Sequence, residues 1–175
     1  THPRSSAASD VYKRQRLNRA SAKEIRSFME EHSDLAPSDI MFRRWLKKLG
    51  QKRHWTTLLQ NFSDADYQRS RDDELRCYYV RALYGREQRK KALDWTTDLW
   101  LSPKSQPKAC DPIFDVWRTT PRFTEEIAWQ RFDAAIKNNQ RKLSRYLLRF
   151  FTGSNKRAAE AYYQVHTQPK RVAKR

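Results

Sequence analysis

Apolar side chains in this sequence recur three and four residues apart, and this spacing limits the possible fold more than any other feature. Between residues 72 and 84 the apolar positions on one helical stripe are Leu75, Tyr78, Tyr79, Ala82 and Leu83. Turn-forming residues interrupt such stretches roughly every ten to twenty residues. The sequence therefore predicts an all-α fold built from short helices.

The apolar material is dominated by large aromatic rings. Only 38% of residues are hydrophobic, whereas the chain has 8 Phe, 6 Trp and 8 Tyr and just 3 Gly. Burial must then depend on aromatics flanked by long charged side chains, which suits amphipathic helices better than sheets. The apolar runs are too short for a membrane span of about 20 residues.

About nine helices are predicted, and several have recognisable ends. Ser21 and Glu24 form a capping box that opens a helix with Ile25, Phe28 and Met29 directed inward. The next helix is expected to stop at Gly50, acting as a left-handed cap. The last helix is expected to begin at Ser154 and to bury these residues: Ala158, Ala161, Tyr162 and Val165.

The order of the helices predicts stacked hairpins. Helices over residues 72–84 and 86–101 form one hairpin, and the residues from Gly85 to Ala92 have the spacing of a tetratricopeptide-like turn. No strict repeat period is present, and no long central helix is available for a closed bundle. The predicted architecture is part of a degenerate tetratricopeptide-like α-superhelix.

Residues 1–15 are interpreted as foreign to the protein. Residues 5–15 read SSAASDVYKRQ, which matches a transposase-based sequencing adapter translated in frame. We therefore expect residues 1–15 to be disordered and residues 16–175 to form the folded part. The same interpretation implies a chain truncated at its N-terminus, from which a signal peptide has been lost. The C-terminal end is expected to be cut off too.

The chain carries a large positive charge. Lys and Arg number 37 against 20 Asp and Glu, giving a formal net charge of +17. Such a surface attracts polyanions until salt screens it. Nucleic acid, anionic lipid and peptidoglycan, whose stem peptides and lactyl groups carry carboxylates, all fit this charge.

Few residues suggest chemistry. The histidines lack partners at ligand spacing, no Gly-rich phosphate loop occurs, and we predict neither a metal site nor a cofactor. Carboxylates around residues 64–74 surround a turn and a helix start, where they complement the helix dipole. A basic run is either a solvated helix face or a binding surface; it consists of Arg86, Arg89, Lys90 and Lys91.

Cys77 and Cys110 leave two alternatives open on residue pattern alone. One lies inside the Tyr-rich helix and the other immediately precedes the Asp111-Pro112 helix start. They are either a disulfide across one hairpin, which implies an oxidising compartment, or two buried free thiols.

The stretch from Cys77 to Trp117 resembles the U-domain of soluble lytic murein transglycosylases. The likeness rests on the elements KSQP at 104–107, ACD at 109–111 and VWR at 116–118, together with the aromatics of residues 77–101. Looser similarity extends it to residues 16–175. The resemblance implies a periplasmic superhelix of short helices and a disulfide between Cys77 and Cys110.

The resemblance also implies a parent reaction. Such an enzyme cleaves the β-1,4 bond between N-acetylmuramic acid and N-acetylglucosamine and closes a 1,6-anhydro ring. One Glu, in a lysozyme-like C-terminal domain opened by a Glu-Ser motif, acts as general acid and base. This chain has no Glu-Ser pair, so we assign it no catalytic residue and expect the fragment alone to be inactive.

Two functions follow as hypotheses. The first is a non-catalytic scaffold that holds peptidoglycan glycan strands near the missing C-terminal catalytic domain, with Arg86, Arg89, Lys90 and Lys91 facing the glycan. The alternative is an independent basic helical module that binds nucleic acid or protein. The aromatics favour the scaffold, because most lie on apolar stripes and buried rings cannot stack on bases.

Overall fold

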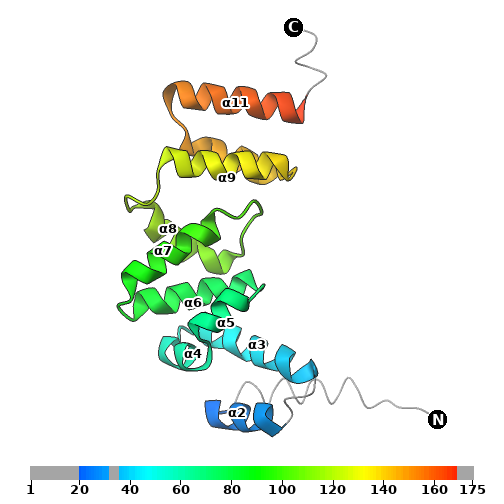
Figure 1. Cartoon of the computed structure of the whole chain (residues 1–175), viewed down its shortest axis with the longest axis vertical. Helices are drawn as coiled ribbons and strands as arrows, with labels where there is room; N and C mark the ends of the chain where they lie inside the picture. The colour runs from blue at the N-terminus through cyan, green and yellow to red at the C-terminus, as the bar shows by residue number, and fades with distance from the viewer. Residues whose placement is uncertain (1–19, 32–35, 169–175) are drawn as a thin grey trace, which may run out of the picture.

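The chain is an open stack of short helices. The computed structural model describes residues 20–31 and 36–168, and in these ranges it contains helices but no strand. Figure 1 shows the helices following one another along the long axis, from α2 at one end to α11 at the other. The predicted all-α fold is confirmed. Residues 1–15, interpreted above as foreign, lie outside the described residues.

The helices are short, and two of the connections contain 3-10 turns. The elements are α2 (Ala22–Glu31), α3 (Ala36–Gln51), α4 (Trp55–Asn61), α5 (Asp64–Arg69), α6 (Asp73–Gly85), α7 (Arg89–Trp100), η1 (Lys108–Cys110), α8 (Asp111–Arg118), α9 (Glu125–Lys137), α10 (Arg141–Leu147), η2 (Leu148–Phe150) and α11 (Gly153–Thr167). No helix in the described ranges combines the length and the hydrophobicity that crossing a membrane requires.

The start of α2 follows the capping prediction. The Glu24 backbone donates to Ser21 Oγ at 3.3 Å, and the Ser21 backbone donates to Glu24 Oε2 at 2.7 Å. Ile25 is buried, but Phe28 keeps 38% of its surface exposed, so its predicted inward direction is wrong. α2 packs mainly on α3, and this contact leaves part of its apolar stripe uncovered.

Gly50 does not end its helix as a left-handed cap. α3 continues through it to Gln51, and the residue with positive φ is Arg53, at 58°. A Cβ atom built on Gly50 would lie 2.2 Å from Cγ of Tyr78. Glycine is therefore required here because α6 approaches α3 closely, and not because of its backbone angles.

The sequence analysis did not predict helix α5. It has six residues and a single large buried side chain, Tyr67. It is stabilised by a second capping box, in which the Asp66 backbone donates to Ser63 Oγ at 3.2 Å and the Ser63 backbone donates to Asp66 Oδ2 at 2.9 Å. Part of the acidic cluster at residues 64–74 thus belongs to a helix and not to a turn.

The hairpin of α6 and α7 forms the centre of the stack. The five apolar positions predicted for residues 72–84 are all buried. The Tyr67 ring stacks on Trp95 with centroids 4.5 Å apart, and the Tyr79 ring lies 5.6 Å from Tyr67. These rings join α5, α6 and α7 through large apolar contact areas, as the aromatic-rich composition predicts.

A disulfide links α6 to the start of α8. Cys77 and Cys110 are bonded, their Cα atoms are 4.9 Å apart, and both residues are fully buried. Asp111 is the first residue of α8 and does not serve as its cap, because the N-cap position is Cys110 and makes no side-chain cap bond. The covalent bridge therefore holds the α8 start against the second turn of α6.

The C-terminal helices pack in a register that differs from the prediction. Thr152, not Ser154, occupies the N-cap position of α11. Ala159 is the buried residue of α11, whereas Ala158 and Ala161 are exposed and Val165 keeps 49% of its surface exposed. The predicted inward face is thus wrong at these positions, because α11 contacts the stack only along the stripe that includes Ala159.

Candidate functional site

The predicted basic run lies at the turn between α6 and α7. Arg86 caps the end of α6, and Glu87 takes the positive φ of 67° that reverses the chain. α7 begins at Arg89, three residues later than predicted, so its first turn contains Arg89, Lys90 and Lys91 and no acidic residue. The amide dipoles of a helix N-terminus favour anions, so three cations there raise the positive potential further.

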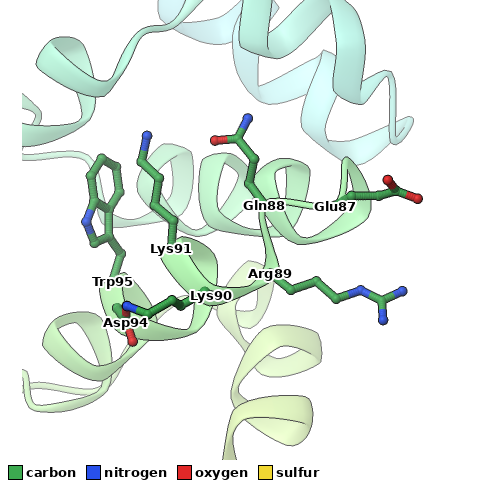
Figure 2. A pocket seen from close by; sticks show the side chains of 7 residues that line it. All are labelled: Glu87, Gln88, Arg89, Lys90, Lys91, Asp94 and Trp95. Atoms are coloured by element: carbon green, nitrogen blue, oxygen red, sulfur yellow. The ribbon is translucent and has the colours of Figure 1, made fainter.

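The basic side chains do not share one face. In Figure 2, Lys91 and Trp95 extend toward the same side of α7, Lys90 lies beside Asp94, and Arg89 points away from both. A shallow depression of about 370 Å³ lies among these groups; it is lined by Glu87, Gln88, Arg89, Lys90, Lys91, Asp94 and Trp95. The structure thus brings three of the four predicted residues to one depression and leaves Arg86 outside it.

Two of the four cations are neutralised by carboxylates. Lys90 Nζ lies 2.9 Å from Asp94 Oδ2. Lys91 forms an ion pair with Asp64, and its Nζ lies 4.7 Å from the centroid of the Trp95 ring. Hydrogen bonds to Asp94 from Lys90 first, and then from Arg122, hold the pKa of its carboxyl below the ordinary value.

The other two cations have no carboxylate partner among the described residues. Arg86 donates to the Thr56 hydroxyl, and the Arg89 guanidinium lies 5.5 Å from the centroid of the Tyr84 ring. Both side chains are exposed. Arg86 and Arg89 are therefore the members of the run whose charge is most available to an outside anion.

The acidic residues near this surface are used in structural contacts. Tyr79 Oη donates to Asp64 Oδ1 at 2.6 Å, which joins the buried ring stack to the Lys91 ion pair. Desolvation raises the pKa of Asp64, but the hydrogen bonds from Lys91 and Tyr79 outweigh it and leave that pKa below its ordinary value. Asp64 is therefore a fixed anion that anchors α5 to α6 and α7.

Asp72 and Glu74 have a similar structural use. The Leu75 backbone donates to Asp72 Oδ1 at 3.1 Å, so Asp72 caps α6. Lys47 Nζ lies 2.8 Å from Asp72 and 2.9 Å from Glu74, which ties α3 to the start of α6. Within the described ranges, no group of His, Cys, Asp and Glu is arranged to hold a metal ion.

Trp95 is the residue of this surface that the sequence interpretation missed. It belongs to the buried ring stack through its contact with Tyr67, and it also lines the depression. Its position four residues after Lys91 places the two side chains on one face of α7. That spacing was a signal that could have identified it.

The sequence is similar to part of some much longer curated proteins. The soluble lytic murein transglycosylase of Salmonella typhimurium is 30% identical over 113 residues, and that of Escherichia coli strain K12 is 29% identical over the same length. These matches cover 65% of this chain and 17% of each relative. No protein-family model matches the sequence.

Solved structures show the same helical arrangement. A lytic transglycosylase Slt from Pseudomonas aeruginosa, determined as an inactive mutant, matches 91% of this chain with a TM-score of 0.77 and 29% identity. The 70-kDa soluble lytic transglycosylase from Escherichia coli matches 93% with a TM-score of 0.75 and 24% identity. This chain covers 25% and 26% of those two chains, respectively.

Proposed function

Because this chain is homologous to a part of soluble lytic murein transglycosylases, we propose that it is the superhelical scaffold of such an enzyme. The observation that carries the proposal is the shared fold, at a TM-score of 0.77 over 91% of this chain. On this proposal residues 16–175 are a segment of the superhelical domain. The scaffold works in the periplasm, beside a catalytic domain elsewhere in the same protein.

The scaffold's task is to hold peptidoglycan strands. The relatives are named for acting on murein, and the net charge of +17 suits a polymer whose peptides carry carboxylates. The turn between α6 and α7 is the proposed contact, since it combines the basic first turn of α7 with the ring of Trp95. Arg86 and Arg89 supply the charges that no described carboxylate neutralises.

The proposal is tested by co-sedimentation with purified sacculi, with anhydro-muropeptides measured in the supernatant. We expect binding that weakens as salt rises, because the attraction is between exposed charges. We expect no anhydro-muropeptides, because no catalytic residue is assigned to this chain. Their release by the purified chain would contradict the scaffold assignment.

A double variant tests the contact surface. Arg86→Gln with Arg89→Gln should weaken sacculus binding about three- to tenfold, since each exposed pair contributes up to about 1 kcal/mol. The matched control is Arg145→Gln with Arg157→Gln, which removes the same charge from exposed positions on α10 and α11. Equal losses in the two double variants would show diffuse charge attraction and would remove the assignment of the α6–α7 turn.

Nucleic acid is the competing partner for this charge. Most of the Trp and Tyr rings pack against other rings of the chain, so few remain available for stacking on bases. A single-stranded DNA that displaces the chain from sacculi at equal charge concentration would favour the nucleic-acid module instead.

A further inference from the structure

A second cleft, of about 510 Å³, lies where two parts of the stack meet. α9 and α10 pack mainly on each other. Phe123, just before α9, contacts Trp100 of α7 and Phe150 of η2, and Arg131 of α9 donates to the Ser102 carbonyl. The walls of the cleft come from the loop at 102–107 and from α8, α9 and α10. A joint between packed units is a common place for a binding site.

Arg131 is a buried cation in this cleft. It is 3% exposed, its Nε donates to the Ser102 carbonyl at 3.1 Å, and its Nη2 donates to the Lys104 carbonyl at 3.3 Å. Its guanidinium lies 4.7 Å from the centroid of the Trp100 ring. Among the described residues no carboxylate lies within 4.0 Å of it, and the two hydrogen bonds named above both go to backbone carbonyls. A buried charge is ordinarily paired, so Arg131 lacks an anion.

Gln106 supplies a second unmatched group in the same cleft. Its Nε2 donates to Asp73 Oδ2 at 3.4 Å, which directs the amide and leaves Oε1 as the free end. Oε1 is buried and has no hydrogen-bond partner among the described residues. A buried carbonyl oxygen without a partner is unusual, and it requires an N–H donor.

The remaining charges leave the cleft cationic. Lys142 lines it and forms no ion pair among the described residues, whereas Arg118 is paired with Asp115. Asp111 is the other carboxylate in the lining. Three cationic and two carboxylate side chains thus leave one net positive charge.

We propose that this cleft binds the C-terminal carboxylate of a short peptide. Arg131 and Lys142 hold the carboxylate, and Gln106 Oε1 accepts the N–H of the last peptide bond. The rings of Phe114 and Tyr146, which also line the cleft, contact the terminal side chain. A carboxylate next to an N–H donor satisfies both unmatched groups, and it is a feature of any peptide C-terminus that does not end in proline.

The protonation state of Arg131 suits this role. Desolvation lowers the pKa of its guanidinium to about 10, against an ordinary value of 12.5. The side chain therefore stays cationic at neutral pH. The proposal deepens the function proposed above and rests on it for its natural ligand, because the peptides of peptidoglycan end in carboxylates.

The probe is N-acetyl-alanyl-alanine, and its C-terminal amide is the matched control ligand. Both are titrated into the full chain at low salt, with the Nε–H signals of the arginines followed by NMR. The carboxylate should bind and shift the Arg131 signal. The amide should bind at least about tenfold more weakly, since hydrogen bonds to charged groups contribute about 1.5 to 3 kcal/mol. Equal binding of the two probes, or no binding of either at about 10 mM, would overturn the proposal.

Variants separate binding from stability. Lys142→Gln and Gln106→Met should each weaken probe binding about three- to tenfold. Lys142 is exposed, so its variant should keep its melting temperature, whereas Gln106→Met also removes the bond to Asp73 and its melting temperature is measured alongside. Arg145→Gln, on the same helix but outside the cleft, is the control and should bind the probe normally. Arg131→Met should abolish binding, but it also removes the bonds to the loop, so its melting temperature is measured alongside. Normal probe binding by both Lys142→Gln and Gln106→Met would overturn the assignment.

A sacculus experiment distinguishes the source of the peptide and the two levels of proposal. If the cleft takes cell-wall peptides, sacculi from which an amidase has removed the peptides should bind less of the chain than intact sacculi do. Binding of the chain to both kinds of sacculi, without binding of the probe, would overturn the cleft proposal and leave the scaffold proposal standing. Probe binding without any sacculus retention would overturn the scaffold and leave the cleft as a site for other peptide C-termini.

Discussion

At the scale of single residues, close packing decides more than backbone preference. Gly50 and Gly85 both lie in helices, where alanine is ordinarily favoured by roughly 0.5 to 1 kcal/mol. Their surroundings differ. A Cβ atom on Gly50 would overlap Cγ of the Tyr78 ring, whereas a Cβ atom on Gly85 would lie 3.0 Å from Cδ1 of the Trp55 ring. The two glycines therefore respond differently to the same substitution.

Gly50→Ala should destabilise the chain by about 1 to 3 kcal/mol, because the overlap with Tyr78 forces α3 away from α6. Gly85→Ala is the control and should lie within about 1 kcal/mol of the unaltered chain, since a small shift of Trp55 offsets the helix gain. Urea unfolding followed by circular dichroism measures both. A Gly50→Ala chain as stable as the Gly85→Ala chain would contradict the close approach of the two helices.

Arg131 shows how far single positions can be read from the sequence. Its spacing from Ala128 and Ala135 places it on the buried stripe of α9, so its burial was in principle predictable. Its partners were not, because the carbonyls of Ser102 and Lys104 come from a loop far away in the sequence. The basic run, by contrast, was visible as a run, and only the directions of its side chains required the structure.

At the scale of elements, a helix was predictable where its apolar stripe was wide. α6 was predicted nearly to its ends, since it is covered by α3, α4, α7 and α8 and needs a continuous stripe. α5 was missed because six residues with one large buried side chain carry no detectable period. The face of α11 was predicted wrongly because its narrow contact leaves several apolar residues exposed.

The link between α6 and α8 should contribute strongly to stability. Closing a loop with a sequence separation of 33 is expected to stabilise the fold by about 3 to 4 kcal/mol, through the restricted unfolded chain. A reductant should therefore lower the melting temperature of the chain. It should have no effect on a Cys77→Ala with Cys110→Ala variant, which is the control. Two free thiols in the unfolded, unreduced protein would contradict the bond.

At the scale of the whole molecule, stability is expected to be local because most contacts join helices a few elements apart along the stack. In such arrays the energy is close to a sum of neighbouring contacts, and one end can open while the other stays folded. A closed bundle would lose all its helices together.

Matched core truncations at the two ends test this. Ile25→Ala should speed amide exchange in α2 and α3, and Leu147→Ala should speed it in α10 and α11, because each removes buried apolar contacts of its own end. Hydrogen exchange read by mass spectrometry reports each helix separately. Faster exchange in all helices of either variant would show a single cooperative unit.

The disulfide also changes how such a stack responds to force. An array pulled from its ends can lengthen one helix at a time, up to about 3.5 Å per residue. The bond between Cys77 and Cys110 removes the intervening segment from that extension, because tension passes across the bridge and not around the loop. Thirty-three residues correspond to about 115 Å of slack that the oxidised protein never releases. The segment between the two cysteines is thus shielded from the load, and only residues outside it can be drawn out.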